Sequence, residues 1–342
     1  MIEPRSRLFL NLKRFLLLAV GIALCVVIIF NSEITLDLVI GQIIAIPLFY
    51  LVLFLLVEFC ALLLISMRWH VIVRHLQSNV SFLRGFFFCY STLSLLAGSY
   101  FNFIGGMGTR LYFLKTNSEV GMKQGICSTL LEPILSWFIL GVVMVPSLLF
   151  ITDLISLNTA IILAIVMLVA CCCIFTTFAN KTFKLILHIA NLFMTLGTKI
   201  IGKLRDQKKN LASFEEFQSI SHKKLTLLLT QTLMIYLLAP TNSWLIAKAI
   251  GIDAELPVFI LIFPMVYLVH IMGFTPAGLG IKELGYIGMI LYLDFDKDIA
   301  TIFAFSKRVL DEAVLILFTI SGYAFYNLMK RWASITSRSE KI

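Results

Sequence analysis

The sequence predicts an all-α polytopic membrane protein, with about six spans and two re-entrant helical hairpins in an inverted repeat. Hydrophobic residues make up 60% of the 342 residues and charged residues only 14%. Several apolar runs reach the length of about 20 residues that crosses a bilayer, which excludes a soluble domain. A Gly-x-Gly pattern occurs twice, at Gly106-Met107-Gly108 and at Gly278-Leu279-Gly280. Each copy interrupts a helical run, which is typical of a broken helix.

The first half, residues 1–180, is expected to hold four spans and one hairpin. The spans are predicted at residues 15–30, 43–66, 124–150 and 159–179. No small-x-small cleavage pattern follows the first run, so it is interpreted as a retained span and not as a signal peptide. Residues 86–104 are polar in their second half. A crossing there would place Arg110 outside and invert the bias of basic residues, so a hairpin that enters from the cytoplasm is favoured.

The second half, residues 225–342, is expected to hold two spans and the second hairpin. The spans are predicted at residues 225–247 and 299–328, and the hairpin at residues 257–293, where Thr275-Pro276-Ala277-Gly278 breaks the helix. This hairpin would enter from the outside. Between the halves, residues 181–224 are predicted to form a cytoplasmic amphipathic linker, because apolar residues recur there at helical spacing among many lysines. Residues 1–342 are treated as one transmembrane domain.

The placement of basic residues predicts both termini on the cytoplasmic side of a cell inner (plasma) membrane. In this topology all 28 Lys and Arg residues face the cytoplasm except Lys248, Lys282, Lys297, Lys307 and Arg308. The net charge of +9 is therefore explained without nucleic acid as a partner. The seven cysteines lie in apolar runs without Cys-x-x-Cys spacing, so neither disulfides nor a metal site is expected.

The two glycine patterns are the first candidates for a ligand site. Hairpins that enter from opposite faces form an inverted repeat, and transport sites in such repeats form at broken helices near the bilayer midplane. Glycine lets the backbone approach a ligand, and a basic residue follows each pattern. We therefore expect lipid-headgroup binding at Gly106, Gly108, Arg110, Gly278, Gly280 and Lys282. The alternatives are that the glycines only allow helices to pack closely, and that Arg110 is an interfacial anchor.

Charged residues inside the predicted spans are the second set of candidates. Each costs about 2.5 to 3.5 kcal/mol to insert, so each should face a partner or a cavity. Lys307-Arg308 lies one turn before Asp311-Glu312, and these residues could form a self-neutralising structural cluster. Lys282 and Glu283 point about 100° apart; Lys282 is favoured toward the ligand and Glu283 toward a basic partner such as Arg308, with the opposite assignment open. The predicted charge partners are Glu58, Glu132, Glu283, Lys307, Arg308, Asp311 and Glu312.

Four segments of the chain resemble the flippase-like transmembrane region of lysylphosphatidylglycerol synthases. They are FNFIGGMGTRLYFLK (residues 101–115), LE (131–132), TPAGLGIKE (275–283) and KR (307–308), and the similarity covers nearly the whole chain. Two positions depart from the family motifs: Ile104 or Gly105 stands where the first motif has proline, and Pro133 stands where arginine follows the glutamate. The motifs are matched at Arg110, Glu132, Pro276, Gly278, Gly280, Glu283 and Arg308.

The resemblance implies a membrane domain that binds or flips a lipid. It does not imply synthesis, because the aminoacyl transferase domain of that family is soluble and follows the membrane region; a separate lipid-synthesising enzyme is therefore an expected partner. We expect translocation of a phosphate-bearing lipid, either an aminoacyl-phospholipid or a polyprenyl-linked or glycolipid intermediate of envelope synthesis. Arg110 and Lys282 would hold its phosphate from opposite sides. In the empty site these cations would be neutralised by Glu58, Glu132 and Glu283.

Other function classes are less well supported by the sequence. Residues 105–108 lack the Lys-Ser/Thr and the strand context of a P-loop, so no nucleotide, cofactor or catalytic residue is predicted. Movement would be driven by a lipid or ion gradient, or be passive. A rival is a membrane-embedded glycosyl or phospholipid transferase that uses Asp294, Asp296 and Asp298. A third reading is a membrane partner that moves nothing, and a homodimer is left open.

Overall fold

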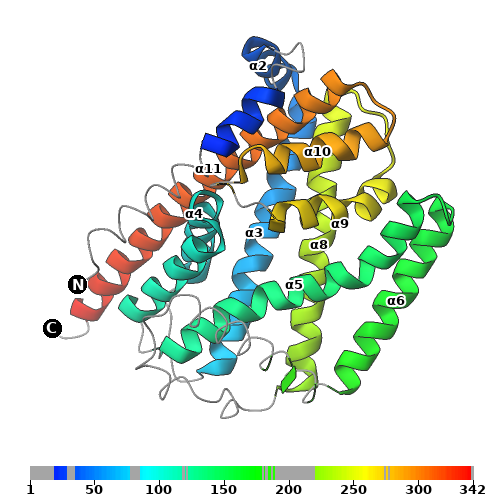
Figure 1. Ribbon diagram of the computed structural model, residues 1–342. Coiled ribbons are helices and arrows are strands. Elements are labelled where there is room, and N and C mark those ends of the chain that lie inside the picture. Colours follow the sequence, from blue (N-terminus) through cyan, green and yellow to red (C-terminus); the bar gives the residue numbers. More distant parts are fainter. Residues whose placement is uncertain are drawn as a thin grey trace, which may run out of the picture.

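The computed structural model describes residues 19–28, 35–77, 85–117, 120, 122–178, 181, 184–185, 188, 220–272, 275 and 278–339. Helices are the only regular elements in these ranges (Figure 1). Five of them are long and apolar enough to cross a membrane, so the chain is an all-α polytopic membrane protein, as predicted. The labelled helices are α2 (Leu36–Ala45), α3 (Leu48–Leu76), α4 (Phe86–Asn117), α5 (Met122–Ile151), α6 (Leu157–Thr177), α8 (His222–Ile250), α9 (Leu256–Met272), α10 (Ile281–Tyr292) and α11 (Lys297–Ser339).

Most predicted helices are found close to their expected bounds. This holds for α5, α6, α8, α9 and α10. A short apolar helix, Ala19–Ile28, lies within the first predicted span. The rest of that span and nearly all of the predicted amphipathic linker fall outside the described residues.

The prediction for the second span is wrong at both ends. Ile46-Pro47 separates the short α2 from α3, and proline suits the start of a helix because the N–H it lacks would have no partner there. At the other end α3 continues to Leu76, where the side chains of Arg68 and Trp69 are 5% and 0% exposed. Arg68 is therefore a buried helical residue, although the charge count placed it in a cytoplasmic loop.

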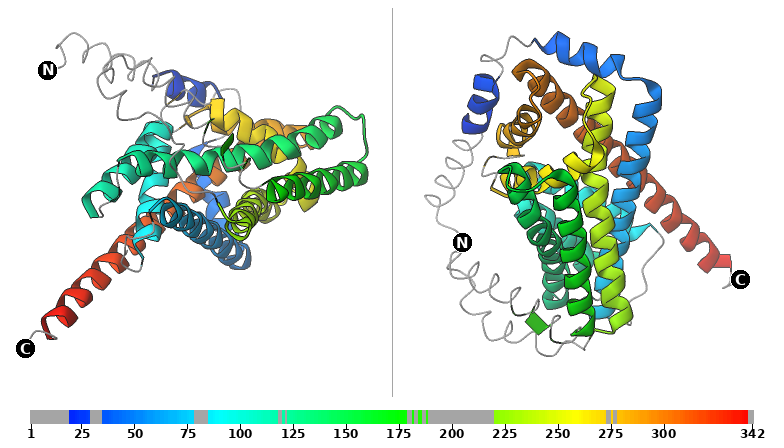
Figure 2. Two further views of the ribbon diagram at one scale, coloured as in Figure 1. Left: turned by 90° about the horizontal axis from the view of Figure 1, so that it is seen from below. Right: turned by 90° about the vertical axis from the view of Figure 1, so that its right-hand side faces the viewer.

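The last helix is longer than predicted. α11 contains 43 residues, and its C-terminal part extends away from the other helices (Figures 1 and 2). As far as Tyr326 the helix still packs against α4, but its other side carries exposed apolar side chains, among them Ile320, Tyr323 and Leu328. Exposed apolar side chains are expected where a helix faces lipid.

α4 is helical along its length but is not a straight rod. The Ser94 hydroxyl donates a hydrogen bond to the Gly106 carbonyl oxygen at 2.9 Å, and the rings of Tyr90 and Phe113 stack with their centroids 3.9 Å apart. In a straight helix, residues twelve positions apart are separated by about 18 Å. The chain therefore folds back into two arms, as the predicted first hairpin requires. Entry of this hairpin from the cytoplasm stays a prediction.

The second break in the helices lies between α9 and α10, where Thr275 to Gly278 was predicted to interrupt the chain. Gly278 and Gly280 have φ angles of +64° and +79°, which residues with side chains rarely adopt. The Thr275 hydroxyl donates a hydrogen bond to the Leu279 carbonyl oxygen at 2.8 Å. The turn is therefore specified by glycine at two positions and braced by one threonine.

A tyrosine compensates for the proline within α9. Pro264 has no N–H to offer the carbonyl oxygen of Ile260, four residues earlier. The hydroxyl of Tyr236 on α8 donates a hydrogen bond to that oxygen at 3.0 Å. The backbone acceptor is thus satisfied across two helices, which fixes α9 against α8.

α3 and α8 form a central antiparallel pair (Figures 1 and 2). Both helices contain 29 residues, and an offset of 174 residues carries Leu48 onto His222 and Leu76 onto Ile250. A constant offset between helices of equal length is expected if the two halves of the chain are repeats of each other. The inverted repeat itself stays a prediction.

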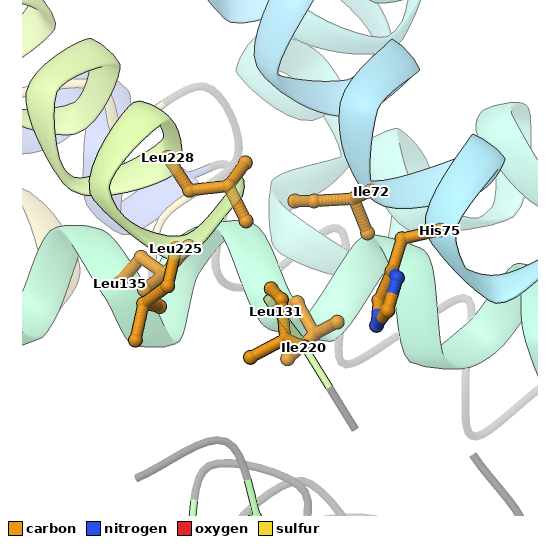
Figure 3. Close-up of a pocket in the computed structure, with 7 residues that line it drawn as sticks. All are labelled: Ile72, His75, Leu131, Leu135, Ile220, Leu225 and Leu228. Atoms are coloured by element: carbon orange, nitrogen blue, oxygen red, sulfur yellow. The ribbon is translucent and has the colours of Figure 1, made fainter. Parts of the chain in front are cut away.

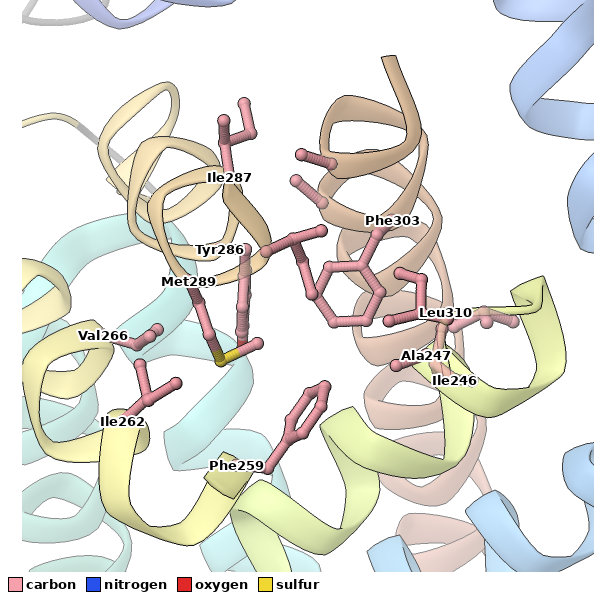
Figure 4. Close-up of a cluster of buried hydrophobic side chains, with 14 of the residues drawn as sticks. Ile246, Ala247, Phe259, Ile262, Val266, Tyr286, Ile287, Met289, Phe303 and Leu310 are labelled. Carbon is pink, nitrogen blue, oxygen red and sulfur yellow. The ribbon is translucent and has the colours of Figure 1, made fainter. Parts of the chain in front are cut away.

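Apolar clusters hold the other helices against this pair. In one of them, side chains from α8, α9, α10 and α11 point toward a common centre (Figure 4). A second cluster joins α3, α5 and α8 around a gap of about 10 Å³ lined mainly by leucine and isoleucine (Figure 3). Such a gap barely reaches the volume that one water needs, so it is a packing feature and not a ligand site.

Candidate functional site

Three charged side chains from three helices meet inside the protein. They are Arg68 of α3, Arg110 of α4 and Glu132 of α5, with exposed fractions of 5%, 6% and 4%. Both arginines form ion pairs with the Glu132 carboxylate, Arg68 through Nε at 3.4 Å to Oε1 and Arg110 through Nη1 to Oε2. We call these three residues the basic cluster.

The Arg68 guanidinium is held on a second side by hydroxyl groups. Its Nη1 donates hydrogen bonds to Ser136 Oγ at 3.1 Å and to Thr232 Oγ1 at 3.2 Å. Both hydroxyls in turn donate within their own helices, to the carbonyl oxygens of Glu132 and Leu228. Arg68 therefore ties α3 to α5 and α8 in one fixed orientation.

Arg110 lies against an aromatic ring. Its guanidinium carbon is 4.8 Å from the ring centroid of Trp69, close enough for a cation–π interaction. The Trp69 indole N–H donates to Ser128 Oγ at 3.4 Å, which fixes the ring. The Nε of Arg110 is buried and finds no acceptor among the described residues. One donor of this arginine is thus left over for a ligand.

Among the described residues, no group compensates the excess charge of the basic cluster. Two guanidinium groups face one carboxylate, which leaves a net charge of +1 in a region shielded from solvent. An unpaired buried charge is costly, and charges in such places are usually completed by a counter-ion or a ligand. The arrangement suits one monoanion.

A cavity of about 70 Å³ lies beside the basic cluster. It is bounded by α5, α8 and α9, and its lining includes Ser136 and Thr232, the two hydroxyls that accept from Arg68. The lining also includes Tyr236 and Tyr267. The other lining residues are the apolar Leu140, Ile235, Ala239 and Phe263, and no residue of the basic cluster lines the cavity, so it is a mainly apolar space next to Ser136 and Thr232.

The remaining predicted charge partners form a second group, which we call the acidic cluster. In α11, Lys307 pairs with Asp311, and Arg308 pairs with Glu312 at 3.2 Å between Nη2 and Oε1. Glu283 of α10 lies 3.8 Å from Arg308, which is the pairing favoured from the sequence. The cluster is completed by Lys282 of α10 and Glu58 of α3.

The two cations predicted to share one phosphate belong to different clusters. Arg110 contacts Glu132 and Trp69, whereas the charges that act on Lys282 are those of Arg308, Glu312, Asp311 and Glu283. Lys282 forms no ion pair with a described residue, and its alkyl chain lies over Gly278. The clamp of Arg110 and Lys282 on a single phosphate stays a prediction, and the cation that contacts the same carboxylate as Arg110 is Arg68.

Three of the four predicted glycine ligands face protein atoms. A Cβ on Gly106 would lie 2.8 Å from the Ser94 carbonyl oxygen, and one on Gly280 would lie 2.4 Å from Leu24 Cβ of the N-terminal helix. Gly278 is covered by Lys282, and only Gly108 faces open space. These contacts fit the packing alternative for Gly106, Gly278 and Gly280.

The residue that sequence reasoning missed is Arg68. A weak signal was available, because Val71-Ile72-Val73 resumes the apolar run after Arg68-Trp69-His70. The second guanidinium on Glu132 comes from α3, 64 residues earlier in the chain.

The acidic turn considered for a transferase shows no ligand geometry. Asp294 and Asp296 lie in the turn after α10 and Asp298 in the first turn of α11. Among the described residues, no group of three or more His, Cys, Asp or Glu side chains could hold a metal ion.

Comparison with known proteins gives one finding. The family model for the lysylphosphatidylglycerol synthase TM region matches residues 16–333. No curated protein and no solved structure matches the chain. The matched residues include both clusters and all five helices that are long and apolar enough to cross a membrane.

Proposed function

Because the chain belongs to the lysylphosphatidylglycerol synthase transmembrane-region family, we propose that it binds a phosphate-bearing membrane lipid at the basic cluster and moves it across the bilayer. The family places the chain among membrane proteins related to lipid metabolism. The lipid would be an aminoacyl-phospholipid or a polyprenyl-linked or glycolipid intermediate, supplied by a separate enzyme. The host membrane would be the cell inner membrane, with both termini cytoplasmic.

One observation carries the proposal: the buried net charge of +1 shared by Arg68, Arg110 and Glu132. A phosphodiester carries one negative charge, so it would bring the cluster to neutrality. Arginine is suited to this role because its planar group binds phosphate oxygens through two parallel hydrogen bonds. The Nε of Arg110, which has no acceptor among the described residues, offers a donor for such an oxygen.

In the empty site Glu132 stands in for the phosphate. Its two oxygens each meet one arginine, so the arginines keep their orientation without ligand. An arriving phosphate would compete with this carboxylate for Arg110, which has fewer other polar contacts than Arg68. Binding would therefore exchange one ion pair for another, which keeps the energetic barrier to release low.

The test combines lipid binding with lipid movement. Native mass spectrometry of the purified protein should find an enriched anionic lipid, and Arg68→Ala and Arg110→Ala should each lose it. Proteoliposomes with a fluorescent phospholipid should show faster exchange between leaflets with the unaltered protein than with either variant. Arg74→Ala is the matched control, because it removes an exposed arginine from α3 and leaves the ion pairs of the basic cluster intact.

The outcomes separate the candidate functions. A lipid profile equal to that of the bulk membrane, unchanged in the variants, would refute the proposal. Binding without exchange would favour a partner that moves nothing. Metal-dependent product formation would favour the transferase with Asp294, Asp296 and Asp298.

A further inference from the structure

The helix pair that carries the basic cluster also carries the acidic one. Arg68 of α3 donates to Thr232 of α8, and Asn242 of α8 donates to Glu58 of α3. On both helices the two contacts are ten residues apart, or about 15 Å along the axis. The two clusters are therefore held at a fixed separation by one rigid pair of helices.

Around Glu58, carboxylates outnumber cations. The Asn242 amide donates to Glu58 Oε2 at 2.9 Å, but the nearest cation, Lys307, is paired directly with Asp311. Both Lys307 and Asp311 act electrostatically on Glu58. Two carboxylates thus share one ammonium group, which leaves one negative charge without compensation.

The surroundings of this charge are apolar. The Lys307 ammonium nitrogen is 5.8 Å from the ring centroids of both Phe54 and Tyr286, and the Lys307 residue is only 4% exposed. Tyr286 belongs to the apolar cluster of α8, α9, α10 and α11 (Figure 4). Glu58 itself is half-buried and the Asp311 side chain is 33% exposed, so the two carboxylates lie at the edge of this apolar region, where a cation can reach them.

The other charged groups near Glu58 do not supply the missing charge. From α10 and α11 the cluster receives Lys282 and Arg308, which are balanced by Glu283 and Glu312. The charges of α4 and α5, Arg110 and Glu132, belong to the basic cluster. The described members of the acidic cluster therefore sum to −1: Lys282, Lys307 and Arg308 against Glu58, Glu283, Asp311 and Glu312.

Unpaired oxygen atoms point to the same conclusion independently. Asn242 is 2% exposed, and its Oδ1 has no hydrogen-bond donor among the described residues. The same holds for one carboxylate oxygen each of Glu283, 1% exposed, and Glu312. Buried acceptors without donors are rare in native proteins, and a bound cation satisfies them directly.

We propose that Glu58 and Asn242 form a binding site for one monovalent cation, a proton or Na⁺, and that this site and the basic cluster fill together. The cation would bring the acidic cluster to neutrality, as the phosphate does for the basic one. The cation site stands on its own observations; its coupling to lipid rests on the proposed function.

Coulomb's law sets the size of the coupling. While both sites are empty, charges of +1 and −1 attract each other across about 15 Å. A ligand that fills either site neutralises its charge, so the attraction is lost when the first ligand binds. The second ligand then binds without losing any further attraction. With an effective dielectric constant of 20, the bound cation should tighten lipid binding about sixfold.

The first experiment observes the cation directly, without lipid. Infrared spectroscopy of the purified protein should show the carbonyl band of a protonated buried carboxylic acid, and Glu58→Gln should remove it. If Na⁺ is the cation, the band is absent and NaCl raises the unfolding temperature more than choline chloride does, again only with Glu58 present. Asp253→Asn, a change of an exposed acid, is the matched control.

The second experiment measures the coupling. The affinity for phosphatidylglycerol should rise about sixfold as pH falls or as Na⁺ is added, whichever ion the first experiment identified. Glu58→Gln mimics the neutral state, so it should bind lipid tightly under all conditions. Absence of both the Glu58 band and the Na⁺ effect would overturn the cation site. A cation site without lipid binding would overturn the proposed function and leave the site standing.

Discussion

Replacing Glu132 with glutamine should destabilise the protein and tighten lipid binding at the same time. The change keeps the shape of the side chain but removes the carboxylate that both Arg68 and Arg110 contact. The net charge of the basic cluster rises from +1 to +2. Lower stability together with tighter lipid binding is expected only if Glu132 both stabilises the arginines and competes with the ligand for them. If Glu132 served only in packing, its loss would not tighten lipid binding.

The magnitude follows from the burial of the cluster. Removing one partner of a buried ion pair costs about 3 to 5 kcal/mol. The lower end is expected here, because glutamine still offers one acceptor and Arg68 keeps Ser136 and Thr232. Lipid at 100 times its dissociation constant returns about 2.7 kcal/mol. Saturating lipid should therefore restore most of the lost stability.

The assay is thermal unfolding in detergent with and without added phosphatidylglycerol. The Glu132→Gln variant should unfold at a lower temperature than the unaltered protein and should gain more from the lipid. Asp253→Asn serves as the control. Lys248 donates a hydrogen bond to Asp253 and lowers the pKa of that carboxyl, but the exposed pair contributes little to stability. Equal unfolding temperatures, or equal gains from lipid, would refute the competition between Glu132 and phosphate.

Three further predictions concern packing. Gly106→Ala should force the arms of α4 apart at a cost of about 1 to 3 kcal/mol, whereas Gly108→Ala should leave the unfolding temperature unchanged. Similar unfolding temperatures for the two variants would contradict the close contact between the two arms of α4 at Gly106. Gly280→Ala should destabilise more than Gly106→Ala in the same assay, because it combines a positive φ with a close contact. Tyr236→Phe should cost about 1 to 3 kcal/mol by leaving a buried carbonyl without a donor. Adding Pro264→Ala should recover much of this loss, and a double variant as unstable as the sum of both changes would show that the hydroxyl has another role.

The helices were predictable because their signals are local. Apolar runs gave α5, α6 and α8, and the sequence Thr275 to Gly278 marked the break before α10. The pairing of Glu283 with Arg308 followed from angular spacing on a helix and from the need to neutralise a membrane-embedded charge. Each of these signals lies within one segment or in two helices that follow each other in the chain.

What the sequence could not supply are contacts between distant segments. Arg68 was assigned to a loop because a basic residue at the end of an apolar run usually marks the membrane surface. Its partner Glu132 lies 64 residues further on, so no local pattern connects them. The same reason hid the role of Gly280, which depends on Leu24 of the N-terminal helix. Gly280 was expected to face a ligand because the segment that covers it is remote in the sequence.

The separation of Glu58 from its partner has a consequence for how the chain enters the membrane. Asn242 is 184 residues further along, so at about 5 to 20 residues per second the ribosome delivers it on the order of 10 to 40 s after Glu58. During this interval α3 is in the membrane while the Glu58 carboxyl group lacks its hydrogen-bond donor Asn242. A charged carboxylate would cost about 2.5 to 3.5 kcal/mol, which the otherwise strongly apolar α3 can bear. Biogenesis should therefore pass through a stage in which α3 is inserted without α8, and the acidic cluster should assemble only when α10 and α11 have been made.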